Sequence, residues 1–159
     1  SSANTLVGAV SGAIPPLIGW AGGGQPLLSA GAVFLFALLF FWQLPHFAAI
    51  NWMYREEYIR GGFKMWSNDD ESGHRTAKIA LFYAVCLTLL GILFPLVSSA
   101  MQGWGTLSGG LLGGITVWLA WKFLKNGERG AARSLFYFTL LYLPLMMIAS
   151  YLAWIGVSR

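Results

Sequence analysis

The first 54 residues of this 159-residue chain contain no Asp, Glu, Lys or Arg, and that absence constrains the fold more than any other feature. Hydrophobic residues make up 57% of the chain and charged residues only 10%, whereas a soluble domain averages about 25% charged residues. A chain of this composition belongs in a lipid bilayer. Its single cysteine, Cys86, excludes an intrachain disulfide.

Five apolar stretches, separated by turn residues and charges, are predicted to be membrane spans. Four are long enough to cross a hydrocarbon core of about 30 Å as helices that rise about 1.5 Å per residue. The five run over about 5–20, 28–51, 79–100, 106–124 and 134–156. The first is short and contains Pro15-Pro16, which predicts a broken or re-entrant helix, or the end of a longer span. Runs such as FLFALLFFW do not alternate as membrane strands do, so the predicted fold class is an all-α, polytopic membrane helical bundle.

Charge distinguishes the two ends of these predicted spans. The loops at 21–27 and 101–105 are uncharged and rich in Gly, whereas the loops at 52–78 and 125–133 hold most of the basic residues. Basic loops stay on the cytoplasmic side, or on the matrix side in a mitochondrion, so loop 52–78 and the start of the chain are predicted to lie there. The basic residues form no patch that indicates nucleic-acid binding.

Glycines at four-residue spacing occur in two of the predicted spans. The pairs are Gly109 with Gly113, Gly110 with Gly114, and Gly8 with Gly12. Small residues let helices approach closely in lipid, so these faces are predicted to pack within the bundle. A dimer face, or clearance for a cofactor, is the alternative.

The candidate chemistry lies between the second span and the charged loop. If the helix continues past the membrane surface, one of its faces carries Gln43, His46, Ile50, Tyr54 and Glu57. The adjoining stripe comprises Asn51, Arg55 and Tyr58. A regular helix would separate His46 from Glu57 by about 16 Å. Such a helix suits a substrate with a charged head and an apolar tail.

The charged loop holds both acids and bases that suit a diphosphate site. The acids Glu56, Glu57, Asp69 and Asp70 are oxygen donors that Mg²⁺ accepts when phosphate oxygens complete its octahedron. The cations able to hold the same phosphates are Arg55, Arg60, Lys64, Arg75 and Lys78. The alternative is a mixed-charge loop that is simply solvated at the membrane surface.

His46 lies inside an uncharged, aromatic-rich segment, and two interpretations stand side by side. An ionisable side chain at that depth usually faces a cavity and marks a functional site. The other interpretation is a neutral imidazole bonded to a backbone carbonyl that Pro45 leaves free. His74, in the loop, is expected to be solvated.

Three ordered strings resemble the UbiA-type intramembrane prenyltransferases. They are NTLVGAVSGAIPPLIGW at 4–20, FWQLPHF at 41–47 and REEYIRGGFKM at 55–65. Within that family the resemblance is to the branch that converts haem B to haem O. The strings cover residues 4 to about 65, and the later span pattern is compatible with the same family.

The resemblance implies a nine-helix membrane enzyme whose C-terminal part, about five helices, is residues 1–159. Its reaction transfers a farnesyl group from farnesyl diphosphate to a vinyl group of haem B, with water added and diphosphate released. The implied cofactor is Mg²⁺ bound with diphosphate, and the implied setting is the lipid bilayer of a bacterial inner membrane or a mitochondrial inner membrane. Contact with a haem A synthase or with a terminal oxidase assembly is a further expectation.

Carried onto matching positions, the resemblance implies roles for the residues around 46–64. Catalytic or diphosphate roles fall to Glu57, Tyr58 and Arg55, and metal binding falls to Glu57 and Glu56. Substrate contacts are expected from His46, Asn51, Tyr54, Arg60 and Lys64. Glu57 stands where many relatives have Asp. The family's first Asp-rich motif has no counterpart, because residues 1–68 contain no Asp, so we expect half of the active site to be missing and the fragment to be inactive alone.

Three other functions compete with this interpretation. A non-enzymatic haem-binding or transport subunit would explain His46 and the basic loops, and a purely structural bundle would need no chemistry. A prenyltransferase of the same fold with a quinone or chlorophyll acceptor is the nearest enzyme. The Pro-His-Phe and Arg-Glu-Glu-Tyr strings argue against the last, since such relatives more often carry Asp-x-x-x-Asp there.

Overall fold

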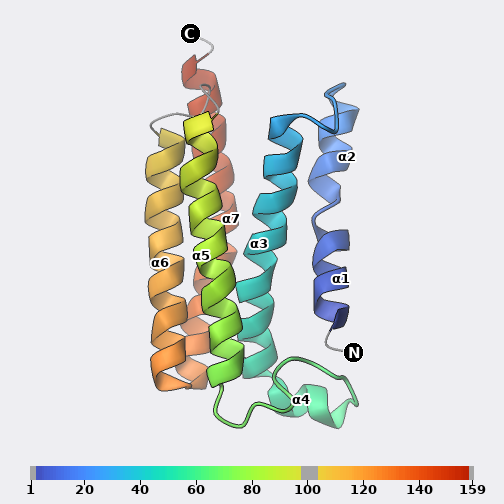
Figure 1. The fold of residues 1–159 in the computed structure, drawn as a ribbon, viewed down its shortest axis with the longest axis vertical. Helices are drawn as coiled ribbons and strands as arrows, with labels where there is room; N and C mark the ends of the chain where they lie inside the picture. The colour runs from blue at the N-terminus through green and yellow to red at the C-terminus, as the bar shows by residue number, and fades with distance from the viewer. Residues whose placement is uncertain (1–2, 98–103, 158–159) are drawn as a thin grey trace.

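The computed structural model describes residues 3–97 and 104–157, and those residues form helices and loops without a strand (Figure 1). The helices are α1 (Ala3–Gly12), α2 (Pro15–Gly22), α3 (Ala30–Met53), α4 (Arg55–Arg60), α5 (His74–Val97), α6 (Trp104–Asn126) and α7 (Arg129–Val157). The predicted all-α class is confirmed.

Five segments are long and apolar enough to cross a membrane, in agreement with the predicted spans. Two helices begin five residues earlier than predicted, α5 at His74 and α7 at Arg129, because their charged first turns extend each helix beyond its apolar part. The predicted span 79–100 and loop 101–105 run partly through residues 98–103, which lie outside the described residues.

The first span is a broken helix, which is one of the forms predicted for it. The break between α1 and α2 falls at Ala13 and Ile14, and Pro15 occupies the first turn of α2. Proline is favoured there because the first N–H groups of a helix have no partner within it. Gln43 ties α1 to α3, since its side-chain amide donates to the carbonyls of Ala9 at 3.4 Å and Leu39 at 3.0 Å.

Helix α3 is the centre of the arrangement. It packs against α1 and α2 on one side and against α5 and α7 on the other, while α6 packs against both α5 and α7 on the side away from α3 (Figure 1). Small residues dominate the core that α3, α5, α6 and α7 share, and they allow the close approach that helices need in lipid. The buried alanines of this core are Ala48, Ala49, Ala77, Ala80, Ala84, Ala120, Ala131 and Ala132.

Two of the predicted small-residue positions lie at a close crossing between α5 and α6. A Cβ added to Gly109 would lie 2.3 Å from the carbonyl oxygen of Gly91, and one added to Gly113 would lie 2.6 Å from Oγ1 of Thr88. Gly114, on the same helix, has no atom within 4 Å of such a Cβ. Packing within the bundle is therefore confirmed for Gly109 and Gly113.

The crossing predicts that Gly109→Val destabilises the full-length protein, because the new methyl groups collide with backbone that cannot move aside. The expected cost is about 1–3 kcal/mol, the usual range for overpacking. Thermal unfolding in detergent micelles, followed by circular dichroism, measures it. Gly114→Val is the matched control and should unfold close to the wild-type temperature; equal losses in both variants would contradict the close crossing.

Both basic loops lie at one end of the bundle, which we call the basic end. The indole N–H of Trp52 donates to the carbonyl of Gly127 at 3.0 Å, and Arg129 pairs with Glu56 at 2.6 Å. The start of α1 lies at the same end (Figure 1). These contacts require loops 54–73 and 127–128 to share one side of a membrane.

Single cysteines should therefore label in a fixed pattern in a Cys86→Ala background. Lys64→Cys and Asn126→Cys, both at exposed positions, are expected to react with an impermeant maleimide from the same side, which by the positive-inside bias is the cytoplasm or matrix. Gln25→Cys should react only from the opposite side. Labelling of positions 64 and 126 from different sides would refute this topology.

Candidate functional site at the basic end

The helix that carries the predicted site does not continue to Glu57 as one regular element. α3 ends at Met53, Tyr54 leaves the helical conformation at φ −110° and ψ 28°, and the six-residue α4 begins at Arg55. The condition for one continuous face from Gln43 to Glu57, a helix that continues through Tyr54, is therefore not met. The change of direction turns α4 across the basic end, where its side chains reach the loops.

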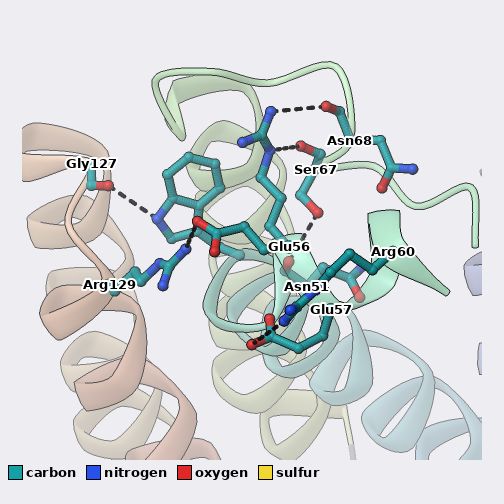
Figure 2. Close-up of polar contacts among 10 residues, drawn as sticks. Asn51, Glu56, Glu57, Arg60, Ser67, Asn68, Gly127 and Arg129 are labelled. Atoms are coloured by element: carbon teal, nitrogen blue, oxygen red, sulfur yellow. Dashed lines mark hydrogen bonds and ion pairs between the residues drawn. The ribbon is translucent and has the colours of Figure 1, made fainter.

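Arg55 holds the loop that follows α4. Its guanidinium donates from Nε to the carbonyl of Ser67 at 2.7 Å and from Nη2 to the carbonyl of Asn68 at 3.0 Å (Figure 2). The hydroxyl of Ser67 donates in turn to the carbonyl of Asn51 at 2.9 Å. The guanidinium also lies 5.9 Å from the centre of the Trp52 ring, a cation–π distance. Arg55 thus fixes the loop against the end of α3 and retains further N–H donors.

The two neighbouring glutamates point to different partners (Figure 2). Glu56 forms its ion pair with Arg129 of α7, whereas Glu57 lies 3.6 Å from Arg60 within α4. Both pairs are exposed, so they contribute little to stability. The long separation in the second pair leaves the Glu57 carboxylate accessible to another cation.

Asp70, considered as a metal ligand from the sequence, caps α5 instead. Its carboxylate accepts bonds from the backbone N–H of Thr76 at 2.7 Å, the hydroxyl of Thr76 at 2.8 Å and the N–H of Gly73 at 2.9 Å. Burial raises the pKa of Asp70, but these bonds, with one from Ser72, outweigh that effect and hold the pKa below its usual value. Among the described residues, no three His, Cys, Asp or Glu side chains gather as a metal site.

A pocket of about 300 Å³ opens between α1, α3 and α4, and we call it the α1–α3 pocket. Its lining is mostly apolar and comprises Thr5, Gly8, Phe47, Ile50, Asn51, Tyr58 and Met65. Two of its polar atoms, Nδ2 of Asn51 and Oγ1 of Thr5, are buried without a hydrogen-bond partner among the described residues. Asn51 is only 1% exposed. A buried polar atom left unbonded costs about 1–3 kcal/mol, so both atoms favour a ligand oxygen nearby.

His46 lies away from this pocket and faces α7. Its Nδ1 is 2.9 Å from the hydroxyl of Thr139, and its ring stacks between Trp42 at 5.3 Å and Phe136 at 4.8 Å. The partner is thus a side chain of another helix, and the prediction of a bond to the carbonyl freed by Pro45 is not what the structure shows. Gln43, expected on the same face, points to α1 instead.

The structure brings some predicted residues together and separates others. Asn51 and Tyr58 line the pocket, and Arg55, Glu56, Glu57 and Arg60 lie on α4, the helix that contributes Tyr58 to its wall. Tyr54 and Lys64 are exposed outside the pocket. Sequence reasoning missed Thr5 and Thr139, whose only signal is a hydroxyl in an apolar helix.

Comparison with known proteins agrees with this architecture. The model of the UbiA prenyltransferase family matches residues 1–154. The chain is 40% identical over 145 residues to the protoheme IX farnesyltransferase of Opitutus terrae, covering 91% of this chain and 48% of that protein. No solved structure matches.

Two mitochondrial proteins of the same name are also similar. Identity is 42% with that of Arabidopsis thaliana, over 91% of this chain and 33% of the relative, and 36% with that of Homo sapiens, over 93% and 32%. The chain thus spans about half the length of the bacterial relative and a third of the mitochondrial ones. Because the family model covers nearly every residue, and the described residues form helices of which five segments are long and apolar enough to span a membrane, this chain belongs to the UbiA prenyltransferase family.

Proposed function

We propose that the full-length protein transfers a farnesyl group from farnesyl diphosphate to a vinyl group of haem B and thereby makes haem O. The observation that carries this proposal is the α1–α3 pocket, whose apolar wall ends at the unbonded amide of Asn51, next to the charged residues of α4. An apolar chain with an anionic head suits such a site. The names of the similar proteins support the same reaction.

Cations at the basic end are proposed to bind the diphosphate. Arg60 and Lys64 are exposed, and Arg55 keeps N–H donors that its two carbonyl bonds do not use. Guanidinium groups bind phosphate oxygens through paired N–H donors, which fixes the head while the chain lies in the pocket. Tyr58, which lines the pocket, is proposed to donate its hydroxyl to an oxygen of the same head.

Glu57 is proposed to hold Mg²⁺ together with that diphosphate. Mg²⁺ binds through one or two carboxylates plus substrate phosphates, so a single accessible glutamate fits this mode. When bound, the ion neutralises the charge of the leaving diphosphate. Glu56 is a second proposed ligand, although it would first have to leave Arg129. The remaining ligands are proposed to come from residues outside this chain.

The proposed reaction breaks the carbon–oxygen bond of the allylic diphosphate. The farnesyl carbon joins the terminal vinyl carbon of haem, and water supplies a hydroxyl to the other vinyl carbon as a proton leaves. An apolar wall such as Phe47, Ile50 and Met65 keeps water from the farnesyl carbon until the haem is in place. His46, between two aromatic rings, is proposed to contact the haem.

The proposed setting follows from the same reaction. The protein would work in a bacterial or mitochondrial inner membrane and pass haem O to a haem A synthase or to terminal oxidase assembly. A haem-binding or transport subunit without catalysis is the second candidate, and the aromatic stacking of His46 is the observation that favours it. Conversion of haem B to haem O by membranes of cells that express the full-length protein separates the two.

Substitution of Glu57 and substitution of His46 should impair the binding of different ligands. Glu57→Gln is expected to lower farnesyl transfer about 10- to 100-fold and to raise the Mg²⁺ concentration needed, with haem affinity nearly unchanged. His46→Ala should weaken haem binding and leave farnesyl diphosphate affinity intact. Haem titration and diphosphate binding, each measured in both variants, test this division.

Glu128→Gln, an exposed glutamate at the α6–α7 turn, is the charge-matched control and should keep wild-type activity. Weaker binding of the same ligand in both test variants would show that Glu57 and His46 do not have the separate roles proposed for them. Loss of stability alone in His46→Ala would assign that residue to packing.

A further inference from the structure

Thr139 of α7 is fully buried and contacts two groups through one hydroxyl. Its Oγ1 lies 2.6 Å from the carbonyl oxygen of Phe136, one turn earlier in the same helix. The same Oγ1 lies 2.9 Å from Nδ1 of His46 on α3. Both distances are those of full hydrogen bonds. The position of the single hydroxyl proton of Thr139 therefore decides whether Nδ1 of His46 donates or accepts the hydrogen bond between them.

The carbonyl of Phe136 can only accept, so the hydroxyl proton of Thr139 must lie between the two oxygens. Without it, two oxygens 2.6 Å apart would repel each other. Oγ1 is then left with lone pairs alone toward the imidazole, and Nδ1 of His46 must be the donor. A neutral imidazole has one N–H, so Nε2 carries the free lone pair.

The charge of the imidazole follows from its surroundings. The helices α3, α5 and α7 contain no acidic residue, so an imidazolium at His46 would be an unpaired charge inside the membrane. The neutral form with its proton on Nδ1 is the form that this environment supports.

The ring is also fixed in direction. The indole N–H of Trp42 donates to the backbone carbonyl of Thr139 at 2.7 Å, so residue 139 binds α3 through both its carbonyl and its hydroxyl. The imidazole is inclined by only 18° to the Trp42 ring and by 26° to the Phe136 ring. Rotation of the imidazole about its side-chain torsion angles would break the hydrogen bond to Thr139 and lose the stacking contacts with Trp42 and Phe136.

We infer that Thr139 is a positioning residue that fixes His46 as the Nδ1–H tautomer and so presents the lone pair of Nε2 to the iron of the haem acceptor. This inference rests on the proposed function for its ligand, and on the Thr139 contacts for its chemistry. Histidines that bind metal through one nitrogen usually donate the other N–H to an acceptor, which fixes the ring and makes the ligating nitrogen more basic.

The tautomer can be measured without haem or turnover. Nitrogen-15 solid-state NMR of the full-length protein in lipid bilayers, labelled at histidine, reports which ring nitrogen carries the proton. His46→Ala identifies the signal by removing it. We expect a protonated Nδ1 and a bare Nε2 in the protein without haem; a protonated Nε2 with a bare Nδ1 would overturn the inference.

Variants at position 139 test its consequence. Thr139→Val keeps the shape but removes the acceptor, so the His46 signals should change toward a mixture of tautomers and haem affinity should fall about 10- to 100-fold. Thr139→Ser should restore both. Thr116→Val is the matched control, because Thr116 is also fully buried and, among the described residues, its hydroxyl bonds only to the carbonyl of Leu112 at 2.8 Å.

The outcomes separate this inference from the proposed function. If Thr139→Val and Thr116→Val lower haem affinity equally, or if serine fails to rescue, Thr139 acts through packing and the inference is wrong. Unchanged haem affinity in Thr139→Val with intact farnesyl transfer would also overturn it but leave the proposed function standing. If the tautomer and haem affinity respond as expected while no haem O forms, the inference holds and the proposed function fails.

Discussion

The attachment of the end of α3 to backbone carbonyls is the interaction on which the site depends. A helix that leaves a membrane exposes its last carbonyls, and the following loop must bond its own polar groups. Here the side chains of Trp52, Arg55 and Ser67 supply the donors, and their acceptors lie in three separate segments. These bonds hold the loop after α4 and the α6–α7 turn against one helix end. The basic end is ordered because these donors and acceptors meet there.

The membrane fold was predictable because its cause is local. A span needs only about twenty apolar residues, whichever helices surround it, and Pro15 marks the broken first span without knowledge of any neighbour. The break at Tyr54 was not predictable in this way. Nothing in the local sequence prevents a helix through Arg55, and the contacts that accompany the break join Arg55 to carbonyls twelve and thirteen residues later.

In the candidate site, too, some residues were predictable from the sequence, whereas others depend on contacts between distant segments. Asn51 and Tyr58 were predicted from the resemblance, and the structure places both on one pocket wall, although their roles stay proposals. Thr5 lines that pocket from α1. A contact between segments so far apart in the chain cannot be predicted from the spacing of residues in the sequence. Asp70 shows the reverse error: an acidic residue in a charged loop looked like a ligand, but its oxygens are occupied by the start of α5.

We propose that the prenyl chain of farnesyl diphosphate occupies the α1–α3 pocket with its head toward α4. Photo-crosslinking of the full-length protein with a farnesyl diphosphate analogue, photoreactive within the chain, tests it most directly when followed by peptide mass spectrometry. We expect adducts on the pocket residues Phe47, Ile50 and Met65, and unlabelled farnesyl diphosphate should suppress them. Suppressible adducts confined to exposed residues of α6, such as Leu111 and Trp118, would contradict it.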